Sequence, residues 1–351
     1  MTKLYNFKDK IDENELQEIA KCIRNNGVVV FPTETVYGIG ANALSFDAVN
    51  KIFIAKGRPT DNPLIVHIDD FNMLNKVAII SNDIEKKLIN SFWPGPMTII
   101  LNKSEEIPLN VTCGLDTVGV RMPSSEIARK IIKEAGVPIA APSANISGRP
   151  SGTNINDIFN ELNERVDYII DGGSSEIGVE STVLKVVNNE VVILRPGKIS
   201  PEDIENLGIK VKLDRHIFTE ASKDENVESP GMKHRHYAPK TQTVLVYSEN
   251  ENKIIDKMKE IIKGYDDNKK ICVIGFEENK YLFKDESNVI YLSYGNKDNL
   301  LSVSSSIFST LRKVDELEVD TCLIEGIKKE GLGIAIMNRL IRACEYNIIE
   351  I

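Results

Sequence analysis

The sequence has little of what a disulfide-bonded, zinc-binding or membrane protein needs. Its five cysteines are odd in number, lie far apart and never form a Cys-x-x-Cys pair, which argues against a disulfide framework and a structural zinc site. No apolar run approaches the ~20 residues of a membrane span. The first ten residues also lack the apolar core of a signal peptide. These absences predict a protein of the reducing cytoplasm.

An excess of positive charge is also lacking, because 52 Asp and Glu outnumber 43 Lys and Arg and the formal net charge is −9 at pH 7. A general nucleic-acid binder needs a basic surface, so this charge argues against that class while leaving room for a small basic cleft. The Gly-x-x-x-x-Gly-Lys-[Ser/Thr] motif of P-loop enzymes is missing. The turns at Gly38 and Gly331 resemble dinucleotide-binding loops only faintly, and His234-Arg235-His236 has metal-like spacing without nearby carboxylates or cysteines.

The chain is long enough for two globular cores, with 351 residues of which 42% are apolar. Strand and helix patterns alternate through residues 1–212, which predicts a mixed, twisted α/β sheet domain. The periodicity fades over residues 213–240, which we interpret as a linker. Alternation returns in residues 241–351 and predicts a smaller C-terminal α/β domain with a mostly parallel, Rossmann-like sheet.

Polar residues gather after the first buried strand. The β-branched run 27–31 predicts that strand, and Pro32 ends it because proline has no hydrogen to donate to a sheet. The next eight residues, predicted as a loop, hold two threonines, Glu34, Tyr37 and two glycines. Loops at strand ends are where α/β sheets bind ligands. Glu34, like Glu180, is a candidate Mg²⁺ ligand or general base, with capping or a salt bridge as the alternative.

Two cations and a histidine follow. A helix is predicted from Ser45, its N-cap, to Gly57, which suits a left-handed C-cap and leaves Lys56 and Arg58 free on a loop. These two suit a phosphate clamp, because arginine offers bidentate donors and lysine a point charge. Solvated charges at a helix end are the alternative. His67, on the next predicted strand, is interpreted as orienting a ligand rather than as a core histidine.

A second polar loop is rich in Gly, Pro and Ser. Its Ser143, Asn145 and Ser151 offer neutral donors to phosphate or ribose, and its backbone can approach an anion closely. Arg121 and Arg195 lie at the exits of predicted strands, where they are either surface charges or partners of an anion. The whole set predicts several cations and hydroxyls converging on one anionic ligand.

Six motifs of the first domain resemble the YrdC-type domain. They are Pro32-Thr-Glu-Thr-Val-Tyr-Gly-Ile-Gly, Lys56-Gly-Arg-Pro, Asn62-Pro-Leu-Ile-Val-His, Trp93-Pro-Gly-Pro-Met-Thr, Val120-Arg-Met-Pro and Ala141-Pro-Ser-Ala-Asn-Ile-Ser-Gly. Later motifs are similar to those of the long, two-domain form of the L-threonylcarbamoyladenylate synthase family. They are Glu180-Ser-Thr-Val, Arg195-Pro-Gly and Ser229-Pro-Gly-Met-Lys-His-Arg-His-Tyr-Ala-Pro. The resemblance covers almost the whole chain, and mainly Gly331–Cys344 carries it in the C-terminal domain.

The resemblance implies a reaction in which L-threonine, bicarbonate or CO₂, and ATP give threonylcarbamoyl-AMP and pyrophosphate. Other proteins would then transfer the threonylcarbamoyl group to an adenosine of tRNA, so a weak tRNA contact is conceivable and a membrane partner is not expected. Mg²⁺ is expected mainly through the phosphates of ATP. No protein ligand to the metal is implied.

The resemblance also implies two sets of binding residues. The threonine site would comprise Thr35, His67, Arg121, Ala141 and Ser181. The ATP site would comprise Lys56, Arg58, Asn62, Thr117, Ser143, Asn145, Ser151, Arg195 and Tyr237. Lys56, Arg58 and Arg195 would be the catalytic cations, and the linker with Tyr237 would close over the nucleotide.

Two other functions compete with this one. A non-catalytic protein that binds structured RNA is disfavoured by the acidic net charge and by polar rather than aromatic loops. A carbamoyl-transfer enzyme of the hydrogenase-maturation type, which uses carbamoyl phosphate, contains a similar domain. Cysteine-pair zinc modules are expected in such enzymes, and this sequence has no Cys-x-x-Cys.

Overall fold

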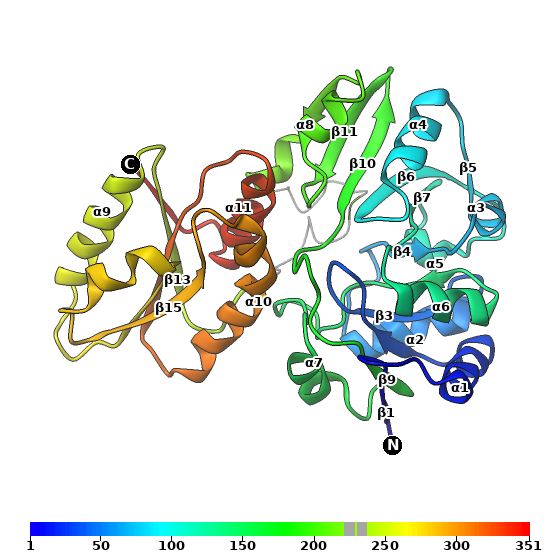
Figure 1. Cartoon of the computed structure of the whole chain (residues 1–351), viewed down its shortest axis with the longest axis horizontal. Coiled ribbons are helices and arrows are strands. Elements are labelled where there is room, and N and C mark those ends of the chain that lie inside the picture. Colours follow the sequence, from blue (N-terminus) through cyan, green and yellow to red (C-terminus); the bar gives the residue numbers. More distant parts are fainter. Residues whose placement is uncertain (221–228, 230–236) are drawn as a thin grey trace. The chain divides into compact units, whose positions relative to one another are not determined.

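The computed structural model describes residues 1–220, 229 and 237–351, which form two compact units with one sheet each (Figure 1). Of the described residues, the first unit comprises 1–147, 151–217 and 229, and the second comprises 148–150, 218–220 and 237–351. His234-Arg235-His236 and much of the predicted linker lie outside the described residues. Among the helices of the described part, none has the length and apolar character to cross a membrane.

The first unit alternates short helices and strands. Its helices are α1 (Glu13–Arg24), α2 (Phe46–Lys56), α3 (Phe71–Val77), α4 (Asp83–Phe92), α5 (Leu109–Thr112), α6 (Glu126–Ala135), α7 (Ile155–Leu162), α8 (Pro201–Glu205) and the 3₁₀ turn η1 (Arg215–Ile217). Its strands are β1 (Lys3–Asn6), β2 (Val29–Phe31), β3 (Gly38–Asn42), β4 (Ile65–His67), β5 (Ala78–Ile79), β6 (Met97–Lys103), β7 (Thr117–Arg121), β8 (Ile139–Ala140), β9 (Tyr168–Asp171), β10 (Thr182–Val187), β11 (Glu190–Arg195) and β12 (Val211–Leu213).

These strands form one 12-stranded sheet in the order β1-β9-β2-β3-β8-β4-β7-β6-β10-β11-β12, with β5 paired to β6. Parallel pairs such as β4 with β7 occur beside antiparallel pairs such as β6 with β7. The predicted mixed α/β sheet is therefore confirmed. Figure 1 shows the β10–β11 hairpin, whose turn residues Asn188 and Asn189 have the positive φ of 51° and 63° that such tight turns require.

Capping residues set the helix limits. Ser45 accepts a hydrogen bond from the Ala48 amide at the start of α2, and Gly57 ends that helix at a φ of 60°, as the sequence predicts. The N-cap of α6 is Ser125 rather than its neighbour Ser124. Ser124 instead donates its backbone N–H to the Glu34 carboxylate.

The glycines after the first polar loop lie in a strand, which the sequence did not predict. Gly38 and Gly40 belong to β3, which pairs antiparallel with β2 and β8. A Cβ on Gly40 would lie 2.6 Å from Ile139 Cγ2 and 2.7 Å from Phe31 Cε1. Glycine here serves close strand packing rather than loop flexibility, so only residues 32–37 form the loop.

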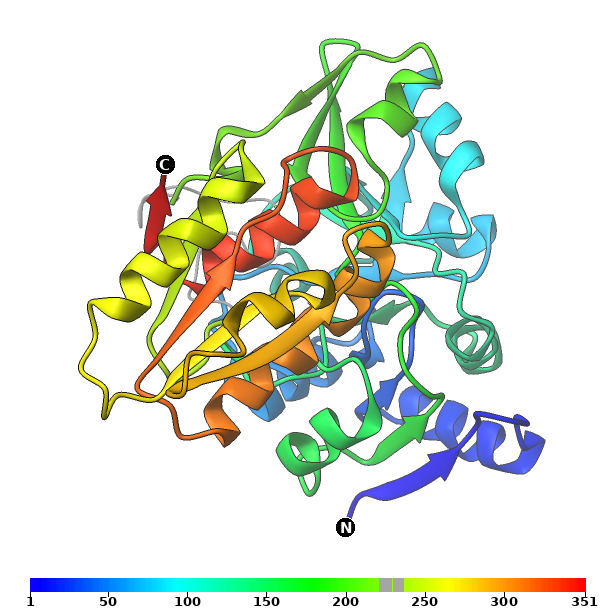
Figure 2. The same ribbon diagram turned by 60° about the vertical axis from the view of Figure 1, so that its left-hand side comes forward.

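The second unit has an entirely parallel sheet. It contains β13 (Thr243–Tyr247), α9 (Glu251–Lys263), β14 (Ile271–Phe276), the 3₁₀ helix η2 (Glu277–Phe283), β15 (Val289–Gly295), α10 (Leu300–Glu316), β16 (Thr321–Glu325), α11 (Leu332–Ala343) and β17 (Ile348–Glu350). The strand order is β15-β14-β16-β13-β17, and every pair is parallel, which confirms the predicted Rossmann-like class. Figure 2 shows α9 on one face of this sheet and α10 with α11 on the other.

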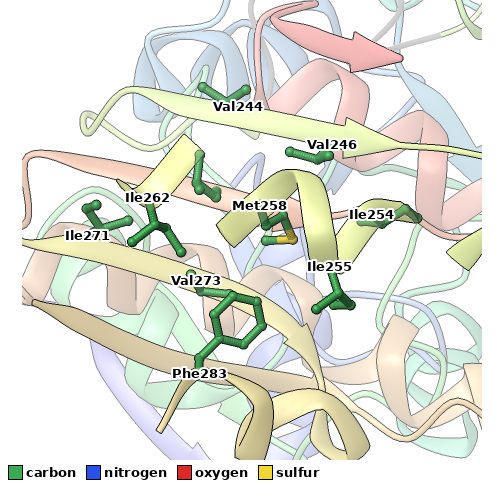
Figure 3. Packing of buried hydrophobic residues seen from close by; sticks show 10 residues of the cluster. Val244, Val246, Ile254, Ile255, Met258, Ile262, Ile271, Val273 and Phe283 are labelled. Atoms are coloured by element: carbon green, nitrogen blue, oxygen red, sulfur yellow. The ribbon is translucent and has the colours of Figure 1, made fainter. Parts of the chain in front are cut away.

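The core of this unit explains its helix–sheet packing. Met258 and Ile262 of α9 face Val246 of β13 and Val273 of β14, and Phe283 of η2 closes the cluster (Figure 3). Apolar residues at spacings of three and four along α9 thus cover apolar residues from alternate positions of the strands. The second unit consequently has a hydrophobic core of its own.

Candidate functional site

One edge of the first sheet gathers charged side chains. His67 ends β4 and Arg121 ends β7, and the two residues are in register on neighbouring parallel strands. Since β6 is antiparallel to β7 and parallel to β10, the start of β10, next to Ser181, lies at the same edge. Arg195, at the end of β11, is paired with Val183 of β10. The strand order therefore brings four predicted site residues together.

Arg121 is the centre of a buried polar cluster. Its Nη1 donates to Thr35 Oγ1 at 2.8 Å, and its Nε donates to the Gly95 carbonyl at 3.3 Å. Its Nη2 lies 2.7 Å from Glu34 Oε1 in an ion pair. Burial raises the pKa of the Glu34 carboxyl, but Arg121 and hydrogen bonds outweigh it and hold that pKa below its usual range. Thr33 fixes the loop, because its hydroxyl contacts Thr35 Oγ1 at 2.9 Å and donates to the Val36 carbonyl at 2.6 Å.

His67 is a neutral imidazole beside this cluster. Its side chain is buried, and burial together with the Arg121 charge lowers its pKa to about 3. No atom of the described residues forms a hydrogen bond with its Nδ1. A buried polar atom without a partner is costly, so a ligand at this edge would gain by supplying one.

Lys56 is buried rather than free on a loop. It is 1% exposed, and its Nζ donates to the carbonyls of Ser143 and Asn145, at 2.7 Å for Asn145, and to Asn145 Oδ1 at 3.4 Å. Ser143 Oγ in turn donates to Asn145 Oδ1 at 2.6 Å. Burial, with the nearby Arg58 charge, lowers the pKa of Lys56 well below its usual value. The alternative of solvated helix-end charges is therefore wrong for this residue.

Arg58 is also buried, at 7% exposure. Its Nε donates to the Asn62 carbonyl at 3.2 Å and its Nη2 to the Pro63 carbonyl at 3.0 Å. Pro63 and Thr117 line the same small hollow. Thr117 begins β7, about 13 Å along the strand from Arg121, so the structure places it with Pro63 rather than with the Arg121 cluster.

Ser181 links the remaining residues. Its hydroxyl lies 2.7 Å from Thr98 Oγ1, and Arg195 Nη2 donates to the Ser181 carbonyl at 3.0 Å and to its hydroxyl at 3.2 Å. Ser151 donates to Glu180 Oε1 at 2.6 Å, one residue before Ser181 in the chain. Glu180 thus acts as a hydrogen-bond acceptor in this network.

Three further residues have different surroundings. The amide of Ala141 donates to the Ile65 carbonyl at 2.9 Å, which holds the second polar loop against β4. The Tyr37 hydroxyl donates to the Gly173 carbonyl at 2.6 Å. Tyr237 belongs to the second unit, where its buried ring stacks on Phe308 with centroids 4.9 Å apart. That Tyr237 covers a nucleotide stays a prediction.

Two partners in these networks were not predicted as site residues. Thr98 appears in the sequence analysis only within the motif that begins at Trp93, and Glu34 only as a candidate metal ligand, base or salt-bridge partner. Their roles depend on β6 lying beside β10 and on the loop after β2 reaching Arg121. Pairing between distant strands has no local sequence signal, although the run Trp93-Pro-Gly-Pro-Met-Thr marks the segment that contains Thr98.

Comparison with known proteins places this site in a family. The model of a family described as "Telomere recombination" matches residues 21–197, and one described as "Threonylcarbamoyl-AMP synthase, C-terminal domain" matches residues 199–344. The threonylcarbamoyl-AMP synthase of Pyrococcus abyssi is 42% identical over 352 residues, which is 100% of both chains. That of Bacillus subtilis is 40% identical and covers 97% of this chain and 96% of its own. The crystal structure of P. abyssi Sua5 complexed with L-threonine matches with a TM-score of 0.91 at 41% identity, over 100% of both chains.

Proposed function

Because this chain belongs to the threonylcarbamoyl-AMP synthase family, we propose that it joins L-threonine, bicarbonate or CO₂, and ATP into threonylcarbamoyl-AMP and pyrophosphate. The observation that carries this proposal is the buried Arg121 cluster, which lies in the same unit as three further buried cations. These are Lys56, Arg58 and Arg195. A carboxylate and a polyphosphate are the ligands that such an arrangement recognises. The relative from P. abyssi, complexed with L-threonine, supports the amino-acid part.

In this reaction an oxygen of the carbamate group of N-carboxylated threonine attacks the α-phosphorus of ATP, and pyrophosphate leaves. Arg121 would bind the threonine carboxylate, because its guanidinium is buried and arginine N–H groups suit a carboxylate. Thr35, His67 and Ser181 would surround the rest of the amino acid, and the backbone at Ala141 would form the wall. The protein then contributes mainly positioning, which places the attacking oxygen near the phosphorus.

The cations would hold the triphosphate. Lys56, Arg58 and Arg195 are held by backbone carbonyls, so their charges are fixed in place before ATP binds. An arriving polyphosphate favours the protonated form of Lys56, which burial alone disfavours. Asn62, Thr117, Ser143, Asn145 and Ser151 would add neutral contacts, and Tyr237 would cover the nucleotide.

Mg²⁺ would enter with ATP, mainly through its phosphates. In the part of the chain that the structure describes, no three His, Cys, Asp or Glu side chains form a group that could hold a metal ion. Of the two candidate carboxylates, Glu34 pairs with Arg121 and Glu180 accepts from Ser151. The ion would supply charge neutralisation on the departing pyrophosphate.

We further propose that the product serves the threonylcarbamoyladenosine modification of cytoplasmic tRNA by other proteins.

Isotope incorporation tests this function. Purified protein is incubated with ATP, Mg²⁺, L-threonine and ¹³C-bicarbonate, and the products are separated and weighed by mass spectrometry. The proposal expects threonylcarbamoyl-AMP that carries the label in its carbamoyl carbon. Labelled product from carbamoyl phosphate but none from bicarbonate would favour the carbamoyl-transfer alternative and contradict the proposal.

A further inference from the structure

The carboxylate of Glu34 has an unused oxygen beside Arg121. Its Oε1 is occupied, by the ion pair of 2.7 Å with Arg121 Nη2 and by the Ser124 amide at 3.1 Å. Its Oε2 is buried and has no hydrogen-bond partner anywhere in the described chain. The whole side chain is only 7% exposed, so solvent does little to compensate this oxygen. A charged oxygen left in this state costs free energy until a donor arrives.

The neighbouring atoms indicate what kind of donor fits. One N–H of Arg121 Nη2 is taken by Glu34 Oε1, so the guanidinium can offer its remaining N–H groups to a carboxylate, and Glu34 Oε2 offers an anionic acceptor next to them. His67 Nδ1, on the strand that pairs with β7, is the other unpartnered polar atom at this edge among the described residues. A cationic donor and a carboxylate on one small molecule, with a hydroxyl nearby, would satisfy all three groups.

We propose that Glu34 is a substrate-binding residue whose Oε2 accepts a hydrogen bond from the α-amino group of L-threonine while Arg121 binds its carboxylate. This inference rests on the proposed function. The amino nitrogen keeps one N–H after it is carboxylated, so Glu34 retains its donor when the carbamate has formed. Glu34 thereby fixes the nitrogen that must carry the carbamoyl group, and it selects ligands that bear an α-amino group over those that lack one.

A pair of ligands separates this role from a merely structural one. L-Threonine and 3-hydroxybutyrate share the carboxylate and the hydroxyl, and only L-threonine has the amino group. If Glu34 contacts that group, Glu34→Gln weakens L-threonine binding by about 10- to 100-fold, the range for a charge-assisted hydrogen bond. Binding of 3-hydroxybutyrate, which would depend on Glu34 only through the ion pair with Arg121, should weaken by a clearly smaller factor. If Glu34 acts only by orienting Arg121, both ligands should weaken by the same factor.

The measurement is the dissociation constant of each ligand for the full-length chain, obtained by calorimetry or by displacement. Glu85→Gln is the matched control, because Glu85 on helix α4 is another buried carboxylate of the first unit. It accepts a hydrogen bond from the Ser81 amide at 2.6 Å. The control should leave both dissociation constants unchanged. Equal weakening of both ligands in Glu34→Gln would overturn the inference and leave the proposed function intact.

Wild-type protein provides a second measurement if Glu34→Gln does not fold. A carboxylate acceptor holds the amino group as an ammonium ion, so L-threonine should bind at pH 7 with no proton released. Titration in two buffers of different ionisation enthalpy counts these protons. Release of about one proton per threonine would mean that the neutral amine binds, and would overturn the inference. Wild-type protein that binds no L-threonine would instead contradict the proposed function itself.

Discussion

Backbone carbonyls hold the buried cations of the first unit. Lys56 donates to the carbonyls of Ser143 and Asn145, Arg58 to those of Asn62 and Pro63, and Arg195 to that of Ser181. These carbonyl contacts help to fix the positions of the three side chains before a ligand binds. Preorganised cationic groups of this kind stabilise a transition state that is rich in negative charge.

Arg58→Ala should lower the rate of pyrophosphate release by about 10²-fold or more, the scale for loss of one preorganised charge contact. Arg24→Ala is the matched control, because Arg24 also donates to a carbonyl, that of Glu134 at 2.7 Å, but on the exposed face of α1. The control should keep its activity. Turnover of the Arg58 variant near that of the wild type would remove Arg58 from the site.

The low pKa of His67 predicts a pH dependence of stability. Burial and Arg121 depress that pKa from 6.5 to about 3, so the unfolded chain binds a proton in this interval that the folded chain does not. The contribution of His67 to the free energy of unfolding is therefore fully present above about pH 6.5. Below that pH it falls by about 1.4 kcal/mol per pH unit. The free energy of unfolding of His67→Gln should therefore fall by about 1.4 kcal/mol less per pH unit than that of the wild type.

Urea unfolding at pH 8, 6, 5 and 4.5 tests this difference in slope. The comparison at pH 8, where the imidazole is neutral in both states, measures the cost of the substitution itself. The other titrating groups are common to both proteins, so they cancel in the difference. Parallel curves for the two proteins across this range would contradict the pKa assigned to His67.

At the scale of elements, local chemistry predicts much of the fold. Helix caps are short-range signals, so the Ser45 N-cap and the Gly57 C-cap of α2 agree with the sequence. Strand β3 was missed because its two glycines resemble a loop, and the reason for them lies in other strands. A neighbour 99 residues away, Ile139, requires glycine at position 40.

Gly40→Ala should lower the free energy of unfolding by about 1–3 kcal/mol, the usual cost of overpacking a core. Gly38→Ala is the matched control on the same strand, because its Cβ would lie 3.4 Å from Ala141 Cβ and 3.6 Å from Phe31 Cζ, which are ordinary contacts. Its stability should change by less than about 1 kcal/mol. Equal losses in both variants, measured by urea unfolding, would refute the packing argument.

At the scale of the whole molecule, sequence motifs identify the candidate site residues, and the order of strands in the sheet determines which of them lie close together. Lys56 and Arg58 were predicted as a clamp, yet their burial was not, because it depends on the loop after β8 packing against the end of α2. The Glu34–Arg121 pair was likewise invisible, since its two residues are 87 positions apart. Local sequence patterns predict elements and motifs, whereas the hydrogen-bond and ion-pair networks that orient the side chains depend on the order of the strands in the sheet.

The proposed reaction consumes two small co-substrates, L-threonine and bicarbonate, together with ATP. The most direct test is pyrophosphate release from ATP by the purified full-length chain, with L-threonine and bicarbonate each supplied or withheld. We predict release only when both are present, because the carbamate made from them is the group that attacks ATP. Release that is indifferent to L-threonine, or its absence under all four conditions, would contradict this account.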